Sequence, residues 1–302
     1  MSTRAQKSFV LGVGNPLLDI QANIDKEFLE KNGLKMSNAI LVEEKHLHLF
    51  DEMKSKESVK FVAGGSTLNS VRVCQWVLGK SHKNGTSFIG CIGKDKNGQI
   101  LKEYSEKDGV RTYFEEDETA PTGVCGVGIL DKERTLFTRL AAANNFSVDF
   151  LDRKEVKKEY QLADVIYISG YFLTVSIESI ILIAEHSSKN NKILAVNISA
   201  EFIAQIYKAE LEKVLKYADF VFMNEQEAAS YAKYVAGNNK LSLQEVAKKI
   251  ATLPKVNQTE RTVIITRGSQ STLVNCGGDI FANVKVDHIE EDKIVDVNGA
   301  GD

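Results

Sequence analysis

The second half of the sequence alternates between short apolar runs and longer amphipathic stretches. The apolar runs at residues 165–168, 193–198, 220–222 and 262–266 predict strands, and residues 177–189, 208–217 and 243–253 between them have helical spacing. Such alternation is typical of a mostly parallel sheet with helices on both faces. The sequence therefore predicts a doubly wound α/β protein, whose ligands bind at the carboxyl ends of the strands.

The first half keeps this rhythm only as far as residue 107. Strands are predicted at residues 9–14, 59–62 and 86–91, and helices at residues 43–54, 66–78 and 95–107. Residues 110–114, 122–130 and 134–140 then predict three short strands with no helix between them. We expect these three strands to form an antiparallel β lid on the α/β core.

Composition excludes several classes of function. The net charge of −3 and the even spread of Lys and Arg give no electrostatic basis for nucleic-acid binding. The longest apolar run, residues 180–184, is far short of the roughly 20 residues of a membrane span, and we expect no signal peptide. The four cysteines form no C-x-x-C pair, which argues against a zinc site and fits a reducing cytosol.

The segment at residues 296–302, Asp-Val-Asn-Gly-Ala-Gly-Asp, combines bare backbone with a carboxylate. Backbone N–H groups of Gly299, Ala300 and Gly301 could hold an anion if a helix begins there. Asp302 beside such a site suits a base that deprotonates an alcohol while the N–H groups hold a phosphoryl group. A glycine turn with an Asp cap is the equally weighted alternative.

Two motifs near the N-terminus suggest a sugar site. Gly12-x-Gly14 lacks the third glycine of a dinucleotide fingerprint, because residue 17 is Leu. Asn15 and Asp19 instead offer polar groups at a strand end, and Asp19 could accept two hydrogen bonds from a vicinal diol such as that of a ribose. The alternative is a solvated Asp beside a turn.

The sequence Ala-Gly-Gly-Ser-Thr-Leu-Asn-Ser at residues 63–70 is the second motif. Gly64 and Gly65 let the backbone approach a ligand, and Ser66 or Thr67 caps the helix that follows. Asn69 lies one turn into that helix and could bind a sugar hydroxyl. The P-loop motif occurs nowhere in the sequence.

Further candidates follow the later strands. Asn224 and Glu227 are one helical turn apart and suit a Mg²⁺ ion held mostly through water, although the same spacing is that of a capping box. Phe172 and Phe202 could enclose a planar ring, although aromatic residues at strand ends more often belong to a core.

Together these motifs resemble the ribokinase-like (PfkB) family of carbohydrate kinases. The resemblance runs from about Phe9 to Asp302 and rests on residues 15–19, 63–70, 224–227 and 296–302. It implies an α/β nucleotide-binding core at residues 1–16, 66–110 and 142–302, and a discontinuous β lid at residues 17–65 and 111–141. It also implies transfer of the ATP γ-phosphoryl group to the 5′-hydroxyl of adenosine, by a cytoplasmic monomer with the nucleus as a second location.

The resemblance also assigns roles to matching residues. Asp302 is the base, residues 299–302 form the anion hole, and Arg134 reaches in from the lid. The sugar side comprises Asn15, Asp19, Gly64, Gly65, Ser66 and Asn69. The purine and lid side comprises Leu17, Cys125, Leu136, Leu140, Phe172 and Phe202. The nucleotide side comprises Asn224 and Glu227 with Mg²⁺, and Thr266, Arg267, Gly268 and Asn298 beside ATP.

The sequence departs from the family pattern at a few places. Val297 stands where Thr is usual, and Ala39 and Leu68 stand where relatives carry Gln, which bears on the shape of the purine pocket. The family continues with helices after the residue that matches Asp302, so we expect little or no activity from a product that ends there. The alternatives are a related kinase for another nucleoside or a sugar, and a non-catalytic nucleoside-binding form.

Overall fold

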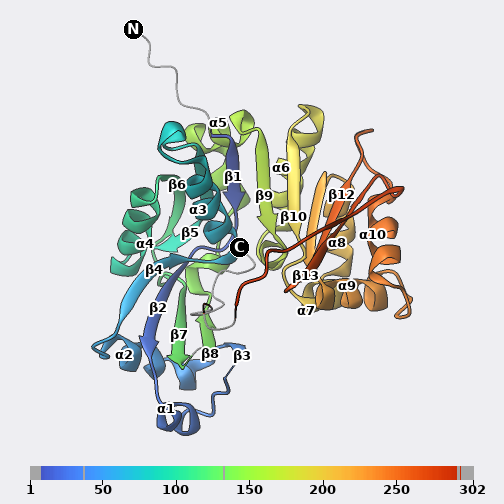
Figure 1. Ribbon diagram of the computed structural model, residues 1–302. Helices are drawn as coiled ribbons and strands as arrows, with labels where there is room; N and C mark the ends of the chain where they lie inside the picture. Colours follow the sequence, from blue (N-terminus) through green and yellow to red (C-terminus); the bar gives the residue numbers. More distant parts are fainter. Residues whose placement is uncertain (1–7, 37, 132, 291–292, 294–302) are drawn as a thin grey trace. The chain divides into compact units, whose positions relative to one another are not determined.

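The structure is a computed structural model that describes residues 8–36, 38–131, 133–290 and 293 (Figure 1). The chain divides into two compact units. The first comprises Met1–Gly14 and Ser147–His288, and the second comprises Asn15–Phe146 and Ile289–Asp302. Each unit is described separately below.

The first unit contains a mostly parallel sheet with strand order β1-β9-β10-β11-β12-β13-β14. Its strands are β1 (Val10–Val13), β9 (Val165–Ser169), β10 (Ile193–Asn197), β11 (Phe220–Asn224), β12 (Thr262–Arg267), β13 (Gln270–Cys276) and β14 (Ile280–Val284). The pairs from β1 to β12 are parallel, and the last two pairs are antiparallel.

Helices connect these strands, as the alternation in the sequence predicts. They are η4 (Val148–Asp152), α5 (Lys154–Leu162), η5 (Gly170–Thr174), α6 (Ile177–Lys189), α7 (Glu201–Ile206), α8 (Lys208–Leu215), α9 (Glu225–Ser230), the π-helical turn η6 (Tyr231–Val235) and α10 (Leu243–Ala251). In α6 the buried residues include Ile180, Ile183, Ala184 and Ser187, the spacing of one helical face, and Ser176 caps its N-terminus. The sheet residues Val263 and Ile265 are fully buried, as the period-two pattern of a strand requires.

The second unit begins with a small sheet and continues into a β–α–β segment. Its elements are β2 (Leu17–Asn23), α1 (Lys26–Lys31), β3 (Asn38–Leu41), η1 (Glu44–His46), α2 (His48–Lys54), β4 (Lys60–Gly64), α3 (Ser66–Leu78), η2 (Lys80–His82), β5 (Thr86–Gly93), α4 (Lys96–Lys107), β6 (Val110–Asp117), β7 (Val124–Leu130), β8 (Glu133–Arg139) and η3 (Ala141–Asn144).

Strand β6 corrects one expectation from the sequence. Residues 110–114 were expected in the antiparallel lid, but β6 pairs in parallel with β5 over its whole length. The physical reason is α4, which lies between the two strands in sequence and provides the crossover that parallel pairing needs. The helix at residues 95–107 was predicted, but its role as the crossover between β5 and β6 was not.

The small sheet has the strand order β3-β8-β7-β2-β4. One face is buried: Leu18 and Ile20 of β2 and Phe137 of β8 join a core cluster with Phe50 and other residues of the helices. The rings of Phe50 and Phe137 lie 5.4 Å apart. Because side chains alternate along a strand, Leu17 and Asp19 lie on the opposite face. The covered face therefore positions Asp19 on the other side of the sheet.

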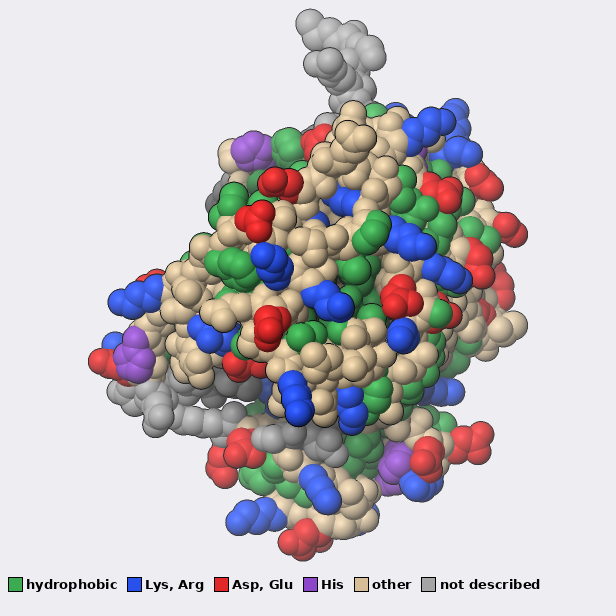
Figure 2. Space-filling view, turned by 90° about the vertical axis from the view of Figure 1, so that its right-hand side faces the viewer, with side chains coloured by type: hydrophobic (Ala, Val, Ile, Leu, Met, Phe, Trp, Pro, Cys, Tyr) green, Lys and Arg blue, Asp and Glu red, His purple; other side chains and the backbone are tan. Residues whose placement is uncertain are grey.

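The predicted fold class is confirmed: the protein is α/β, with a mostly parallel sheet and a small second sheet. The proposed domain boundaries stay a prediction. Acidic and basic side chains are interspersed over the face seen in Figure 2. In the described part of the chain, no helix has the length and apolar character needed to cross a membrane.

Candidate functional site

The carboxylate of Asp19 lies against the backbone of a glycine, Gly64. Strand β2 pairs with β4 on one side and with β7 on the other, which places Leu17 opposite Gly64 and Asp19 opposite Cys125. A Cβ atom added to Gly64 would overlap the carboxylate of Asp19. Glycine at position 64 therefore lets the carboxylate of Asp19, a residue that is only 9% exposed, lie over the main chain.

Gly65 meets a second and independent requirement. Its φ of +97° is in the region that glycine adopts readily, and a Cβ atom there would overlap the carbonyl oxygen of Asn15. Helix α3 begins at Ser66, directly after this turn, and the N–H of Asn69 donates to the carbonyl of Gly65 over 2.9 Å. The two glycines thus bring β2, β4 and the first turn of α3 together.

Asn15 is held at the start of the same region. Its Nδ2 donates to the carbonyl of Ala143 over 3.1 Å, and the residue is 8% exposed. Its Oδ1 is buried and has no hydrogen-bond partner within the residues described here. A buried acceptor without a partner is costly, which suits a residue that awaits a ligand hydroxyl.

Gly123 was not singled out from the sequence and is a finding of the structure. A Cβ atom at this position would lie 2.6 Å from the carbonyl oxygen of Leu140 and 2.7 Å from Cδ2 of Leu17. Two of the predicted purine-side residues therefore meet over a third glycine. The signal in the sequence is limited to the Pro-Thr-Gly segment before β7.

Cys125 is a neutral thiol. Burial raises the pKa of Cys125 to about 12, and the charge of Asp19 contributes to the rise. Thr138 Oγ1 donates to the sulfur over 3.2 Å. The residue therefore offers an apolar surface next to Asp19 and no nucleophile.

Leu136 and Arg134 share the face of Cys125 but lie progressively farther along the sheet. In the β7–β8 ladder, Cys125 pairs with Thr138, Val127 with Leu136, and Ile129 with Arg134. Four positions along a strand correspond to about 13 Å, so Arg134 is well separated from Asp19 along β8. Along the strands, Leu136 therefore lies closer to Cys125 than Arg134 does.

In the first unit, Asn224 and Glu227 form a reciprocal capping box at the start of α9. Glu227 N donates to Asn224 Oδ1 over 2.8 Å, Asn224 N donates to Glu227 Oε2 over 3.0 Å, and Asn224 Nδ2 donates to Glu227 Oε1 over 2.9 Å. Burial raises the pKa of the Glu227 carboxyl, against the lowering effect of the Asn224 N–H. A buried carboxylate of this kind is stabilised by a nearby cation.

Thr266 and Gly268 adjoin this capping box. Thr266 is the strand partner of Asn224, and both side chains are exposed at the carboxyl ends of β11 and β12. Gly268, with a φ of +56°, turns the chain into β13. Arg267 Nε donates to the carbonyl of Ser271 over 2.6 Å, so this side chain supports the hairpin.

The two aromatic residues predicted to enclose a ring differ in exposure. Phe172 is fully buried, whereas Phe202 is 38% exposed and has Tyr171 as its ring partner, with centroids 6.2 Å apart. Burial raises the pKa of Tyr171, and the charge of Glu227 adds to the effect. Tyr171 therefore lies near the capping box, and no local pattern in the sequence distinguishes it from its neighbour Phe172.

Ser199 is a third residue that the sequence did not reveal. Its φ is +70°, which is unusual for a residue other than glycine, and its Oγ accepts the N–H of Gly170 over 3.0 Å. This bond ties the loop after β10 to the loop after β9. Strained residues are often found at functional sites.

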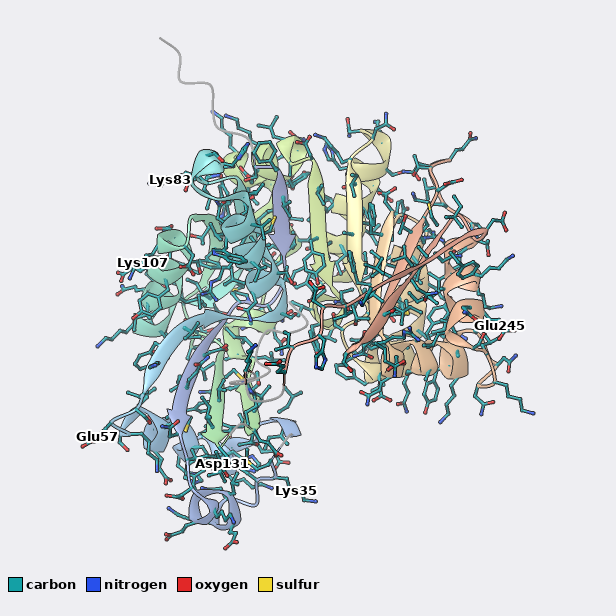
Figure 3. The ribbon with its side chains drawn as sticks, viewed as in Figure 1. Lys35, Glu57, Lys83, Lys107, Asp131 and Glu245 are labelled. Carbon is teal, nitrogen blue, oxygen red and sulfur yellow. The ribbon has the colours of Figure 1, made fainter. Side chains whose placement is uncertain are left out.

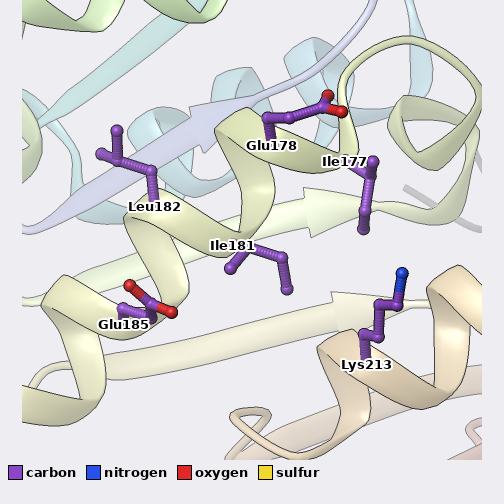
Figure 4. Close-up of a pocket in the computed structure, with 6 residues that line it drawn as sticks. All are labelled: Ile177, Glu178, Ile181, Leu182, Glu185 and Lys213. Atoms are coloured by element: carbon purple, nitrogen blue, oxygen red, sulfur yellow. The ribbon is translucent and has the colours of Figure 1, made fainter.

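A pocket of about 540 Å³ lies elsewhere in the first unit, between α6 and α8 (Figure 4). It is lined by Ile177, Glu178, Ile181, Leu182, Glu185 and Lys213. None of these residues follows a strand end directly or was singled out in the sequence. The pocket therefore does not belong to the candidate site.

The remaining candidates, Asn298, Gly299, Ala300, Gly301 and Asp302, lie outside the described residues. Within the described part of the chain, no group of three or more His, Cys, Asp or Glu side chains is placed to hold a metal ion.

Comparison with known proteins identifies relatives along almost the whole chain. Residues 26–302 match the family described as pfkB family carbohydrate kinase. The chain is 46% identical to adenosine kinase 2 of Arabidopsis thaliana over 97% of its own length and 84% of the relative's. Its structure is similar to that of Anopheles gambiae adenosine kinase in complex with P1,P4-di(adenosine-5) tetraphosphate (TM-score 0.88, 38% identity, 98% and 86% covered). It is also similar to Schistosoma mansoni adenosine kinase in complex with adenosine (TM-score 0.88, 34% identity, 98% and 86% covered).

Proposed function

We propose that this chain, which belongs to the pfkB family of carbohydrate kinases, phosphorylates the 5′-hydroxyl of adenosine with ATP. The observation that carries the proposal is the 46% identity, over 97% of the chain, to a protein named adenosine kinase 2. The products are AMP and ADP, so the reaction belongs to purine salvage.

The second unit supplies the nucleoside side of the reaction. The Asp19 carboxylate accepts hydrogen bonds from the ribose diol, and Gly64 gives it the space to lie over the main chain. Asn15, Gly65, Ser66 and Asn69 complete the sugar side. Leu17, Cys125, Leu136 and Leu140 offer apolar contacts to the purine. Phe172 and Phe202 are assigned to the purine side by the family resemblance.

The chemical step is assigned to residues 298–302. Asp302 takes the proton from the 5′-hydroxyl, whose oxygen forms the new bond to the γ-phosphorus as the bond to the ADP oxygen breaks. Backbone N–H groups of Gly299, Ala300 and Gly301 stabilise the charge on the transferred group, and Arg134 adds a positive charge. Asn298, Thr266, Arg267 and Gly268 lie beside the nucleotide.

Mg²⁺ is proposed as the cofactor, and the residues present fit a hydrated ion. Glu227 is a buried carboxylate whose pKa is raised, and a divalent cation nearby would stabilise its charge. Both of its oxygens are already acceptors for Asn224. Asn224 and Glu227 would therefore hold waters of the ion, which neutralises charge on the phosphates when bound.

A coupled assay of ADP release with adenosine, other nucleosides and free sugars tests the proposal. We expect adenosine to give the highest kcat/KM and AMP to appear in equal amounts with ADP. The assay is run on a chain continued past Asp302, where we expect this turnover, and on this chain, where we expect little or none. Turnover of a sugar with none of adenosine would contradict the proposal.

We also propose that the protein acts in the cytoplasm as a monomer. Light scattering coupled to size-exclusion chromatography tests the mass directly, since a monomer of this chain has a mass of 33.4 kDa. A stable mass of twice that value would contradict the monomer.

A further inference from the structure

Arg72 makes contacts that link it to the sugar side of the site. It lies on α3, one helical turn after Asn69, and its Nη1 donates to Asn69 Oδ1 over 3.2 Å and to the carbonyl of Ala63. Its Nε donates to Asp108 Oδ2 over 2.7 Å, at the C-terminal cap of α4. One guanidinium therefore joins β4, α3 and α4 beside Gly64.

The contact between Arg72 and Asn69 determines which way the amide of Asn69 points. Arginine can only donate hydrogen bonds, so the atom of Asn69 that faces it must be the carbonyl oxygen. The Nδ2 donor is then directed away from Arg72. Within the described residues, no hydrogen bond of this Nδ2 to the protein is found.

The chemistry of a ribose hydroxyl requires this orientation. The Asp19 carboxylate can only accept, so each diol hydroxyl that binds it uses its single proton there. The oxygen of that hydroxyl still has lone pairs, which only a donor can satisfy. With the amide oriented by Arg72, Asn69 is such a donor, and with the amide reversed it would present a second acceptor.

Arg72 also fixes the backbone of β4, because it donates to the carbonyl of Ala63. Ala63 precedes Gly64, over which the Asp19 carboxylate lies. The Arg72 side chain is 24% exposed and its partner Asp108 is 41% exposed, so the ion pair itself contributes little stability. Its consequence is positional, because the pair keeps the guanidinium in place between Ala63 and Asn69.

We propose that Arg72 is a positioning residue for nucleoside selectivity: it orients the Asn69 amide as the donor to a ribose hydroxyl. This inference rests on the proposed function, because it takes the sugar of a nucleoside as the ligand. Arg72 itself does not touch the substrate.

The test measures dissociation constants for adenosine, 2′-deoxyadenosine and 3′-deoxyadenosine by calorimetry. We expect the parent protein to bind one of the deoxynucleosides at least about 10-fold more weakly than adenosine, the usual effect of losing a hydrogen bond in a polar site. Arg72→Met should weaken adenosine and leave that deoxynucleoside nearly unchanged, which removes most of the selectivity. Arg72→Lys should restore part of it, since lysine can donate but lacks the fork.

A double-mutant cycle separates positioning from a general structural effect. In an Asn69→Ala background, Arg72→Met should change the selectivity no further. Lys94→Met is the matched control, because it removes a 2.7 Å ion pair with Glu118 in the same unit, and neither residue is assigned to the site. Equal weakening of all three nucleosides by Arg72→Met would overturn the proposal, as would full retention of selectivity.

If the Arg72→Met protein does not fold, the Asn69→Asp variant tests the same proposal. The aspartate still accepts from Arg72, so the contact between the helix and the guanidinium is preserved, but the donor is lost. Selectivity should fall about 10-fold at an unchanged Tm, and retained selectivity would overturn the proposal. If the parent protein does not bind adenosine at all, it is the proposed function that fails.

Discussion

The nucleoside side in the second unit and the capping box in the first treat their polar groups in opposite ways. At Gly64 and Gly65, side chains are absent: the Asp19 carboxylate lies over Gly64, and the main-chain carbonyl oxygen of Asn15 lies over Gly65. The side-chain oxygen of Asn15 is buried without a hydrogen-bond partner among the described residues. At α9, Asn224 and Glu227 satisfy each other through three hydrogen bonds. The first region is arranged to bind a hydroxyl directly. In the second region the polar atoms already bond to one another, so Asn224 and Glu227 keep these bonds only if they contact a ligand through water.

This difference predicts separate kinetic effects for the two regions. Changes at Asp19 or Gly64 should alter nucleoside binding, and changes at Glu227 should alter the use of MgATP. Substitution of a residue that serves only the chemical step should alter neither the Kd for adenosine nor that for MgATP.

The largest effect is expected for Asp302→Asn, made in a chain continued past Asp302, which tests the chemical step. Loss of a general base lowers kcat by roughly 10²–10⁴-fold. Single-turnover kinetics and calorimetry should show the fall in rate with adenosine binding retained. A kcat close to that of the parent protein would remove Asp302 from this role.

Asp19→Ala and Gly64→Ala should weaken adenosine binding by about 10²-fold, because a charged acceptor with two hydrogen bonds is removed or displaced. The KM for ATP should stay the same. Exposed Glu57 in the same unit (Figure 3) provides the control Glu57→Ala. If Gly64→Ala binds adenosine normally, the space over the main chain is not needed for the nucleoside.

Glu227→Gln should lower kcat/KM for MgATP by about 10-fold, on the scale of one interaction with a charged group, and leave the Kd for adenosine unchanged. Glu245→Gln is the matched control, because Glu245 occupies the same capping-box position in α10 (Figure 3). Loss of adenosine affinity in Glu227→Gln would contradict the division between the two regions.

The smallest effect concerns the dependence of stability on pH at the two glutamates. Burial raises the pKa of Glu227 above its ordinary value of 4.5, so its favourable contribution is present below that pH and is lost as pH rises through the raised value. Hydrogen bonds from Ser242 lower the pKa of Glu245, so its contribution is present above 4.5 and is lost as pH falls. Tm measured from pH 3 to about pH 8 should therefore rise with pH for Glu227→Gln relative to the parent, and fall for Glu245→Gln. Parallel curves for the two variants would contradict the burial argument.

The sequence predicts what depends on neighbouring residues. The spacing of Asn224 and Glu227 is that of a capping box, and the structure confirms that box. The helix at residues 177–189 is found with the predicted ends, because Ser176 and the apolar spacing define it locally. Asp19 and Gly64 come from separate motifs, and the pairing of β2 with β4 brings them together.

What the sequence does not predict depends on contacts between distant segments. Gly123 matters only because Leu17 and Leu140 pack over it, and Ser199 matters because Gly170 donates to it. The sequence also does not reveal that Leu68 is fully buried in the core cluster of the second unit. No local pattern around these residues contains that information.

The parallel pairing of β2 with β7 has a consequence for how the protein is made. Leu18 pairs with Val124, so the centre of the small sheet cannot close until roughly a hundred further residues have left the ribosome. At about 5–20 residues per second this delay is about 5–20 s. During that time β2 and β4, which carry Leu18, Ile20 and Phe61, lack the neighbouring strand β7. The nascent polypeptide therefore exposes an unpaired strand edge to chaperones.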